Sequence, residues 1–429
     1  MSKFRLPEWC KNILILLLSL SALWLVSLSP LYVGSPLETW VQRHFLPEDP
    51  VADTAVSLTA AARPLMVSIA DADGRYTTRY NATSVESAFD SVTPLLNEAL
   101  SKPGTTFSIS ESRWQDALLQ PGIYLQFDCA IPVSVFANWM TGEDHETFSD
   151  SSSRRFLLAP GELEDAVWLF WQDNSSRRFF ACGTSLSRSE HLEPKVEEWL
   201  PNASFFAFED DDYAACAPYT LLADTPQPAV YSASVPLSSS NPAAVEQVLT
   251  AFSYSPASGA SYAISGGTRY TDGIHTFHLS DSGVLTYHAP AAGVQPASAE
   301  APTLTECIET TRTLLQKTLG QYCGNALLSL ASIEQEGSTL ILTYEYCLDG
   351  IPVTLRQTGW AAQFILTDGS ISEFTLHFRS YTASAESTPI LPELQASAAL
   401  TSLDAEGCEL LLSYLDSGAS TVSAAWLAY

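Results

Sequence analysis

Three histidines in the second half of the chain are the first residues whose types and spacing could support chemistry. His275, His278 and His288 carry imidazole nitrogens, which are common metal ligands. The residues around the first two alternate as in a β-strand, and positions three apart on a strand point to opposite faces. His275 and His278 therefore cannot chelate one ion together, and His278 and His288 lie diagonally on adjacent strands. We expect solvated or hairpin-packed histidines here, and no metal site.

Two acidic segments have the composition of cation sites without the full pattern. Asp71-Ala72-Asp73-Gly74 matches the start of a calcium-binding loop, but Arg75 and Ala82 stand where that loop needs oxygen ligands. The segment predicts a plain hairpin turn instead, because Asp-Gly favours tight turns between strands. Four consecutive carboxylates at Glu209–Asp212 are expected to form a solvated loop.

Two adjacent basic pairs interrupt an otherwise acidic chain, namely Arg154-Arg155 and Arg177-Arg178. We expect each pair to make surface ion pairs within its own half of the chain, where such pairs contribute little stability. Contact with an acidic partner surface is the alternative.

The cysteines suggest neither a disulfide framework nor a zinc site. Seven of the eight follow residue 34, and an odd number at wide spacing without a Cys-x-x-Cys motif does not fit either arrangement. We expect buried thiols, and one disulfide remains an open alternative.

Motifs of nucleophilic, metalloprotease and nucleotide-binding sites are absent from the sequence. It contains no Gly-x-Ser-x-Gly, His-Glu-x-x-His or phosphate-binding loop pattern. We therefore identify no catalytic, cofactor-binding or metal-binding residue, expect no cofactor, and predict that the protein is not an enzyme. An anchored hydrolase with a dispersed active site is the alternative.

Composition excludes two broad classes of protein. The chain has 429 residues, of which 48 are Asp or Glu and 20 are Lys or Arg, so its formal net charge is −28. Nucleic-acid binding requires clustered basic side chains, and this chain has only five lysines. Hydrophobic residues make up 46% of the chain, which is too many for a disordered protein and enough for more than one core.

The N-terminus predicts a membrane anchor. Ile13–Val33 is an uncharged run of 21 residues, and at about 1.5 Å per residue a helix of that length spans the bilayer core. Three basic residues precede it, which favours a cytoplasmic N-terminus. We expect a cytoplasmic tail at 1–11, a transmembrane anchor at 12–33 and a stem at 34–62. The protein would then be a single-pass cell-membrane protein with most of its chain extracytoplasmic; a cleaved signal peptide is the alternative.

The elements beyond the stem predict an α+β fold of antiparallel sheets covered by helices. Prolines at 226–242 mark the boundary between a proximal domain at 63–225 and a distal domain at 226–429, and an Ala/Pro-rich loop occupies 289–302. In the proximal domain, a helix at 85–100 is expected to begin at Ser84, and Ser112 is expected to open a second helix.

The distal domain repeats one unit, a helix followed by antiparallel strands. Helices are expected at 242–252, 303–319 and 391–403, the second with a Thr303–Glu306 capping box. The strand at 338–348 alternates apolar and polar residues, which indicates a sheet with one face covered. A strand is also expected at 261–271, with a bulge at Gly266-Gly267.

With its short tail, single anchor and large exported α+β part, the chain resembles the YycH/YycI regulatory proteins. These are membrane-anchored proteins of low-GC Gram-positive bacteria that act beside the sensor histidine kinase controlling cell-wall metabolism. The likeness spans most of the exported chain as a pattern. The segments that carry it are Trp114–Phe127, Ile131–Trp139, Gly267–Gly273, Leu279–Tyr287, Tyr344–Val353, Phe378–Tyr381 and Ala425–Tyr429.

The resemblance implies a regulator without enzymatic activity. Its anchor and exported domains would contact a sensor histidine kinase, with a paralogous anchored regulator as a further partner, and shift the kinase between two states. The loop at 289–302 resembles an insertion. An anchored extracytoplasmic binding or envelope-assembly module is the alternative function.

Overall fold

The computed structural model describes residues 63–143, 148, 151–289 and 302–429. The predicted tail, anchor and stem at 1–62 and most of the loop at 289–302 lie outside these residues. No helix in the described part is long and apolar enough to cross a membrane. Contacts group Ser57–Tyr429 into one unit, to which all the described residues belong.

The described chain begins with the predicted hairpin. β1 (Met66–Ala70) and β2 (Arg75–Arg79) pair antiparallel. The Asp71 carboxylate accepts hydrogen bonds from the backbone N–H groups of Asp73 and Gly74, at 2.7 and 2.9 Å. The acidic segment therefore closes a turn, as predicted.

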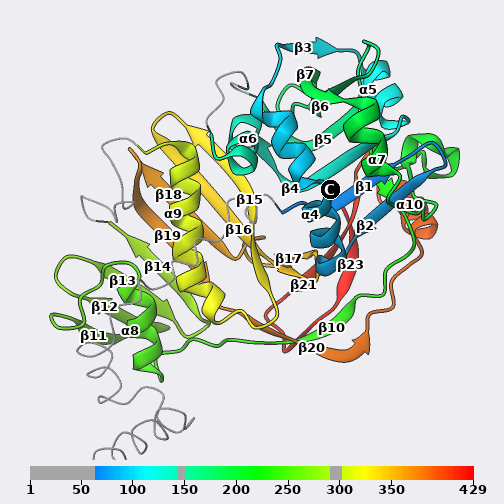
Figure 1. Cartoon of the computed structure of the whole chain (residues 1–429). Helices are drawn as coiled ribbons and strands as arrows, with labels where there is room; N and C mark the ends of the chain where they lie inside the picture. The colour runs from blue at the N-terminus through cyan, green and yellow to red at the C-terminus, as the bar shows by residue number, and fades with distance from the viewer. Residues whose placement is uncertain (1–62, 144–147, 149–150, 290–301) are drawn as a thin grey trace, which may run out of the picture. The chain divides into compact units, whose positions relative to one another are not determined.

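This hairpin forms one edge of a seven-stranded proximal sheet, in the order β2-β1-β4-β5-β6-β7-β3 (Figure 1). All its pairs are antiparallel. The remaining strands are β3 (Thr106–Ile109), β4 (Gly122–Pro132), β5 (Ser152–Pro160), β6 (Ala166–Gln172) and β7 (Phe179–Ser187).

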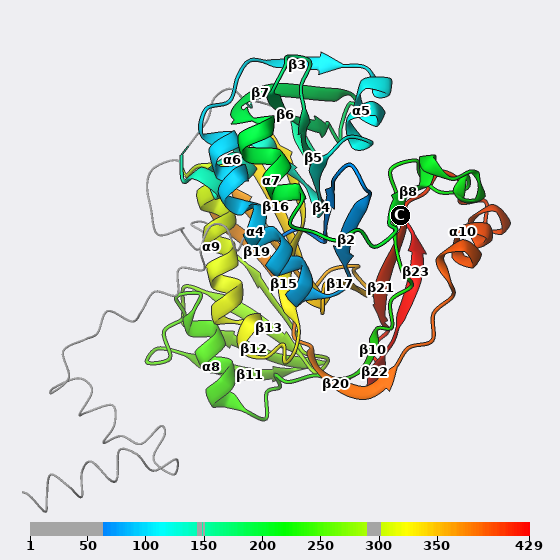
Figure 2. The same ribbon diagram turned by 45° about the vertical axis from the view of Figure 1, so that its right-hand side comes forward.

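Helices cover both faces of the proximal sheet. α4 (Ala82–Ser101) and α6 (Val133–Thr141) lie side by side on one face (Figures 1 and 2), where Leu125 belongs to the same core as both. α5 (Glu111–Leu118) packs on the other face, where Trp114 joins a core with Tyr124. The short helix α7 (Glu193–Val196) follows later in the chain, after β7.

Both predicted helix starts in this half are wrong. Asn81, not Ser84, caps α4, because its extended backbone lets its side chain accept the N–H of Ser84. α5 is capped by Ser110, whose hydroxyl accepts the N–H of Arg113, so Ser112 lies inside the helix.

An eleven-stranded sheet dominates the second half, in the order β11-β12-β13-β14-β19-β18-β16-β17-β21-β23, with β15 paired to β16. One pair, β17 with β21, is parallel, which departs from the predicted antiparallel pattern. The strands are β11 (Ala260–Ile264), β12 (Gly267–Thr271), β13 (Thr276–Ser280), β14 (Val284–His288), β15 (Leu327–Glu336), β16 (Thr339–Leu348), β17 (Ile351–Leu355), β18 (Ala362–Thr367), β19 (Ser370–His377), β21 (Leu410–Asp416) and β23 (Ala424–Ala428).

α8 (Pro242–Thr250) and α9 (Leu304–Lys317) cover one face of this sheet, as both views show (Figures 1 and 2). Phe252, just after α8, stacks on Phe374 of β19, and Thr311 of α9 hydrogen-bonds to Tyr344 of β16 at 2.7 Å. The predicted Thr303–Glu306 capping box is present at the start of α9. Each of these helices precedes antiparallel strands.

The predicted single strand at 261–271 is in fact a hairpin. β11 and β12 pair with Ile264 opposite Gly267, so the chain reverses where a bulge was expected. Gly266 has a φ of +77°, a left-handed conformation that glycine adopts without strain.

Further short elements complete the fold. β10 (Ala229–Ser234) lies between β20 (Ser380–Ser387) and β22 (Thr421–Val422), β8 (Phe205–Phe206) pairs with β9 (Leu221–Leu222), and α10 (Glu393–Ser402) follows β20. Leu411 of β21 packs in the core beneath α5. The predicted boundary at 225/226 remains a prediction, and cores and hydrogen bonds cross it.

Candidate functional site

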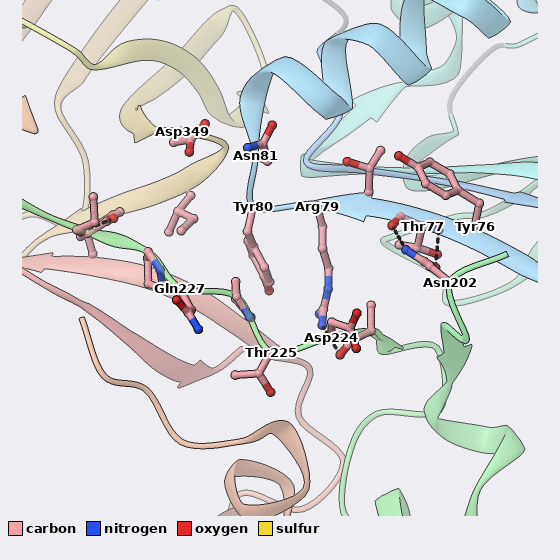
Figure 3. A pocket seen from close by; sticks show the side chains of 17 residues that line it. Tyr76, Thr77, Arg79, Tyr80, Asn81, Asn202, Asp224, Thr225, Gln227 and Asp349 are labelled. Carbon is pink, nitrogen blue, oxygen red and sulfur yellow. Dashed lines mark hydrogen bonds between the residues drawn. The ribbon is translucent and has the colours of Figure 1, made fainter. Parts of the chain in front are cut away.

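A polar pocket of about 360 Å³ lies where proximal and distal elements meet (Figure 3). Its walls are β2, the connecting segment 223–229, the turn between β16 and β17 at Asp349, and Tyr414 of β21. Its labelled side chains come from segments far apart in the sequence, at 76–81, 202, 224–227 and 349, so the pocket exists only in the folded chain.

Arg79 of β2 is the most buried charged group in the pocket wall. Its guanidinium donates to the backbone oxygen of Leu221 at 2.9 Å and pairs with the carboxylate of Glu393 on α10. Only 4% and 5% of these two side chains is exposed. The second oxygen of Glu393 accepts the N–H of Ala223 at 3.1 Å. This ion pair therefore ties β2, the connecting segment and α10 together.

The other polar groups around the pocket also hold segments together. The Tyr80 hydroxyl accepts the N–H of Leu412 at 3.1 Å, and Tyr414 donates to the Ala229 carbonyl at 2.7 Å. Asp349 accepts the first N–H of α4, from Ala82, at 2.9 Å. Hydrogen bonds of this kind position the chain and leave these groups little freedom for acid–base chemistry.

A second buried ion pair joins the proximal sheet to β21. Arg155 of β5 donates to Glu409 at 2.9 Å, and Gln126 of β4 donates to the other oxygen of that carboxylate. Burial alone would raise the pKa of Glu409, but Arg155 and Arg154 outweigh burial and hold this pKa below its usual range. The prediction of surface pairs within one half is wrong here, because the carboxylate comes from the distant C-terminal segment.

The other charge clusters singled out in the sequence also make specific contacts in the structure. Glu209 pairs with Arg75 at 2.7 Å and accepts the N–H of Phe206, so the first carboxylate of the Glu209–Asp212 run is not solvated as predicted. The next one, Asp210, caps a short 3-10 turn. Arg178 lies over the ring of Phe180.

A buried carboxyl group and a half-buried one lie against each other between the sheets. Glu345 of β16 lies against Asp128 of β4, and one of its oxygens is buried without a partner among the described residues. Burial first, and then the neighbouring Asp128, raises the pKa of Glu345 well above its usual range. Glu345 therefore carries a proton under conditions where an exposed glutamate would be ionised.

The histidines lie on opposite faces of the distal sheet, as predicted. His275 contacts the Tyr287 hydroxyl at 3.1 Å on the covered side, whereas His278 lies on the reverse side in register with Thr286. His288 pairs with Glu373 at 3.0 Å. Within the described residues no group of three His, Cys, Asp or Glu side chains could hold a metal ion.

The seven described cysteines are all free thiols, five of them buried. Burial raises the pKa of the Cys182 thiol to about 12, so it stays protonated and unreactive.

The sequence analysis did not predict the ion pairs between the proximal half and the C-terminal segment, although one signal for them exists. Arg75 and Arg79 lie four apart in β2 and therefore share a face. Two arginines on one face of a strand beside a buried core indicate carboxylate partners elsewhere in the chain. The sequence does not say which carboxylates those are.

Comparison with known proteins adds one structural likeness. No family model and no curated protein matches the sequence. The crystal structure of YycH from Bacillus subtilis superimposes with a TM-score of 0.56, covering 86% of this chain and 94% of YycH at 12% identity. The chain therefore has a YycH-like fold, in agreement with the resemblance found in the sequence.

Proposed function

We propose that this protein is a membrane-anchored, non-enzymatic extracytoplasmic regulator that modulates a sensor histidine kinase. The YycH-like fold, extending over most of the chain, is the observation that carries the proposal. The uncharged run at 13–33 supports it, since an anchor would place the folded part beside a kinase's sensor region.

The arrangement of charged groups suits a regulator that transmits contact between its halves. Buried ion pairs from Arg79 to Glu393 and from Arg155 to Glu409 connect the proximal sheet to the C-terminal segment. Buried charge pairs tolerate little displacement, because separating them leaves a charge uncompensated. A structural change caused by a partner at one half would therefore be transmitted to the other half. Such transmission would let the protein shift a kinase between its two states.

The test is a deletion of the gene in its own host, read out by transcription from promoters that the kinase's response regulator controls. We expect altered transcription that the full chain restores. Replacing residues 12–33 with an unrelated span of equal length then asks whether the anchor takes part. Unaltered transcription in the deletion strain would contradict the proposal, whereas unaltered transcription after the span swap would restrict it to the exported domains.

A further inference from the structure

The reverse face of the distal sheet carries a polar surface that the proposed function does not use. α8 and α9 cover the other face (Figures 1 and 2). On the reverse face, β12, β13, β14, β18 and β19 line a pocket of about 550 Å³. The side chains of these strands alternate, so most apolar residues point towards the helices, whereas the polar lining residues and Ile365 point into the pocket.

The strand register places five polar side chains in one row. Each member of the row pairs with the next on the neighbouring strand, from β12 through β13, β14 and β19 to β18. The row consists of Arg269, His278, Thr286, Thr375 and Gln363. It crosses four strand spacings of about 4.8 Å each, roughly 19 Å in all.

The side chains of this row, hereafter the polar row, have no partners of their own. None of them makes a hydrogen bond, ion pair or ring contact with another residue in the described part of the chain. Arg269 is exposed, while Nε2 of His278 is buried without a hydrogen bond. The unpaired ring nitrogen of His278 is unusual, because proteins normally satisfy buried polar groups internally, whereas the exposed guanidinium of Arg269 is open to solvent.

The charge and the hydrogen-bonding groups of the polar row indicate which class of ligand it could bind. Arg269 offers a paired donor for a carboxylate, and threonine hydroxyls and the Gln363 amide both donate and accept hydrogen bonds. A ligand that matches them carries an acidic group at one end and hydroxyls or amides along its length. Arg269 would pair with the carboxylate of the ligand, and Glu373, the carboxylate that also lines this pocket, contacts His288 at 3.0 Å.

Other ligand classes do not fit this face. The backbone groups of these strands are already paired on both sides, so a peptide cannot add as a further strand. Ile365 is the only apolar side chain of the reverse face among the lining residues, which leaves little for a lipid chain to contact. We propose that the polar row binds an acidic, hydroxyl-rich oligosaccharide lying across the strands, with its carboxylate at Arg269.

The test is calorimetric titration of the full-length chain in detergent with a tetrasaccharide of alternating glucuronic acid and N-acetylglucosamine. We expect saturable binding that Arg269→Gln weakens about tenfold or more, since a charge-assisted hydrogen bond is lost. Thr375→Val should also weaken binding. Arg356→Gln is the matched control: Arg356 is exposed and its side chain is likewise unpaired among the described residues, but it lies outside this pocket.

Two comparison probes decide the ligand class. The neutral N-acetylglucosamine tetramer should bind more weakly than the acidic sugar, and tetraglutamate should not bind with comparable affinity. Absence of saturable binding, equal binding of tetraglutamate, or an equal loss in Arg356→Gln would overturn the inference. It requires no kinase, so its failure would leave the proposed regulatory function untouched.

Discussion

At the residue scale, the Arg79–Glu393 pair is the clearest case of a charge that the fold must keep paired. Both side chains are almost completely buried, and the glutamate also accepts a backbone N–H. Removing one partner leaves the other charged in a medium that solvates it poorly, which costs about 3–5 kcal/mol.

Glu393→Gln should therefore lower the free energy of unfolding by about 3 kcal/mol or more, measured by urea denaturation. Glu198→Gln removes the exposed partner of Lys195 and serves as the control, with an expected change below about 1 kcal/mol. Equal effects of the two substitutions would mean that the buried pair does not stabilise the fold.

A second residue-scale prediction concerns pH and Glu345, whose pKa is raised in the folded state. An unfolded glutamate titrates near pH 4.3. Between that pH and the folded pKa the native state binds one more proton than the unfolded state, so stability falls as pH rises. Glu345→Gln removes this titration.

As pH rises through this window, the wild type should lose stability while Glu345→Gln does not. The difference in free energy of unfolding, variant minus wild type, should therefore become more positive. Denaturation at a series of pH values measures it, and Glu336→Gln, at an exposed end of β15, is the control. A pH-independent difference would contradict burial of a protonated Glu345.

At the element scale, local sequence signals were reliable where the decisive interaction is itself local. The Asp-Gly turn at 73–74 closes a hairpin, and Thr303 with Glu306 caps α9. Prediction failed where neighbouring candidates compete, as at Ser84 beside Asn81. The sequence could not predict the ion pairs between the two halves, because Arg79 and Glu393 lie 314 residues apart and no local pattern indicates their pairing.

The α9 cap gives an element-scale prediction. Thr303→Ala removes the side chain that accepts the Glu306 N–H at 3.2 Å, and loss of such a cap costs about 1 kcal/mol. Urea denaturation should show this decrease. Thr305→Ala in the first turn should show none, since alanine favours the helix; equal losses would mean that the cap is not formed.

At the scale of the whole molecule, two halves with separate sheets are joined by buried ion pairs and by apolar cores that contain residues of both halves. The described cysteines are all free, so the fold depends on this packing without covalent links in the described part. The melting temperature should be the same with and without reductant. A large decrease under reducing conditions would show a disulfide that the fold requires.

The regulatory function proposed for this molecule is to change the activity of a sensor kinase. The most direct measurement is the rate of autophosphorylation of the histidine kinase that co-purifies with the full chain, in lipid vesicles with and without this protein. We expect a saturable change in the rate of autophosphorylation that requires the intact chain. An unchanged rate at every ratio of the two proteins would contradict it.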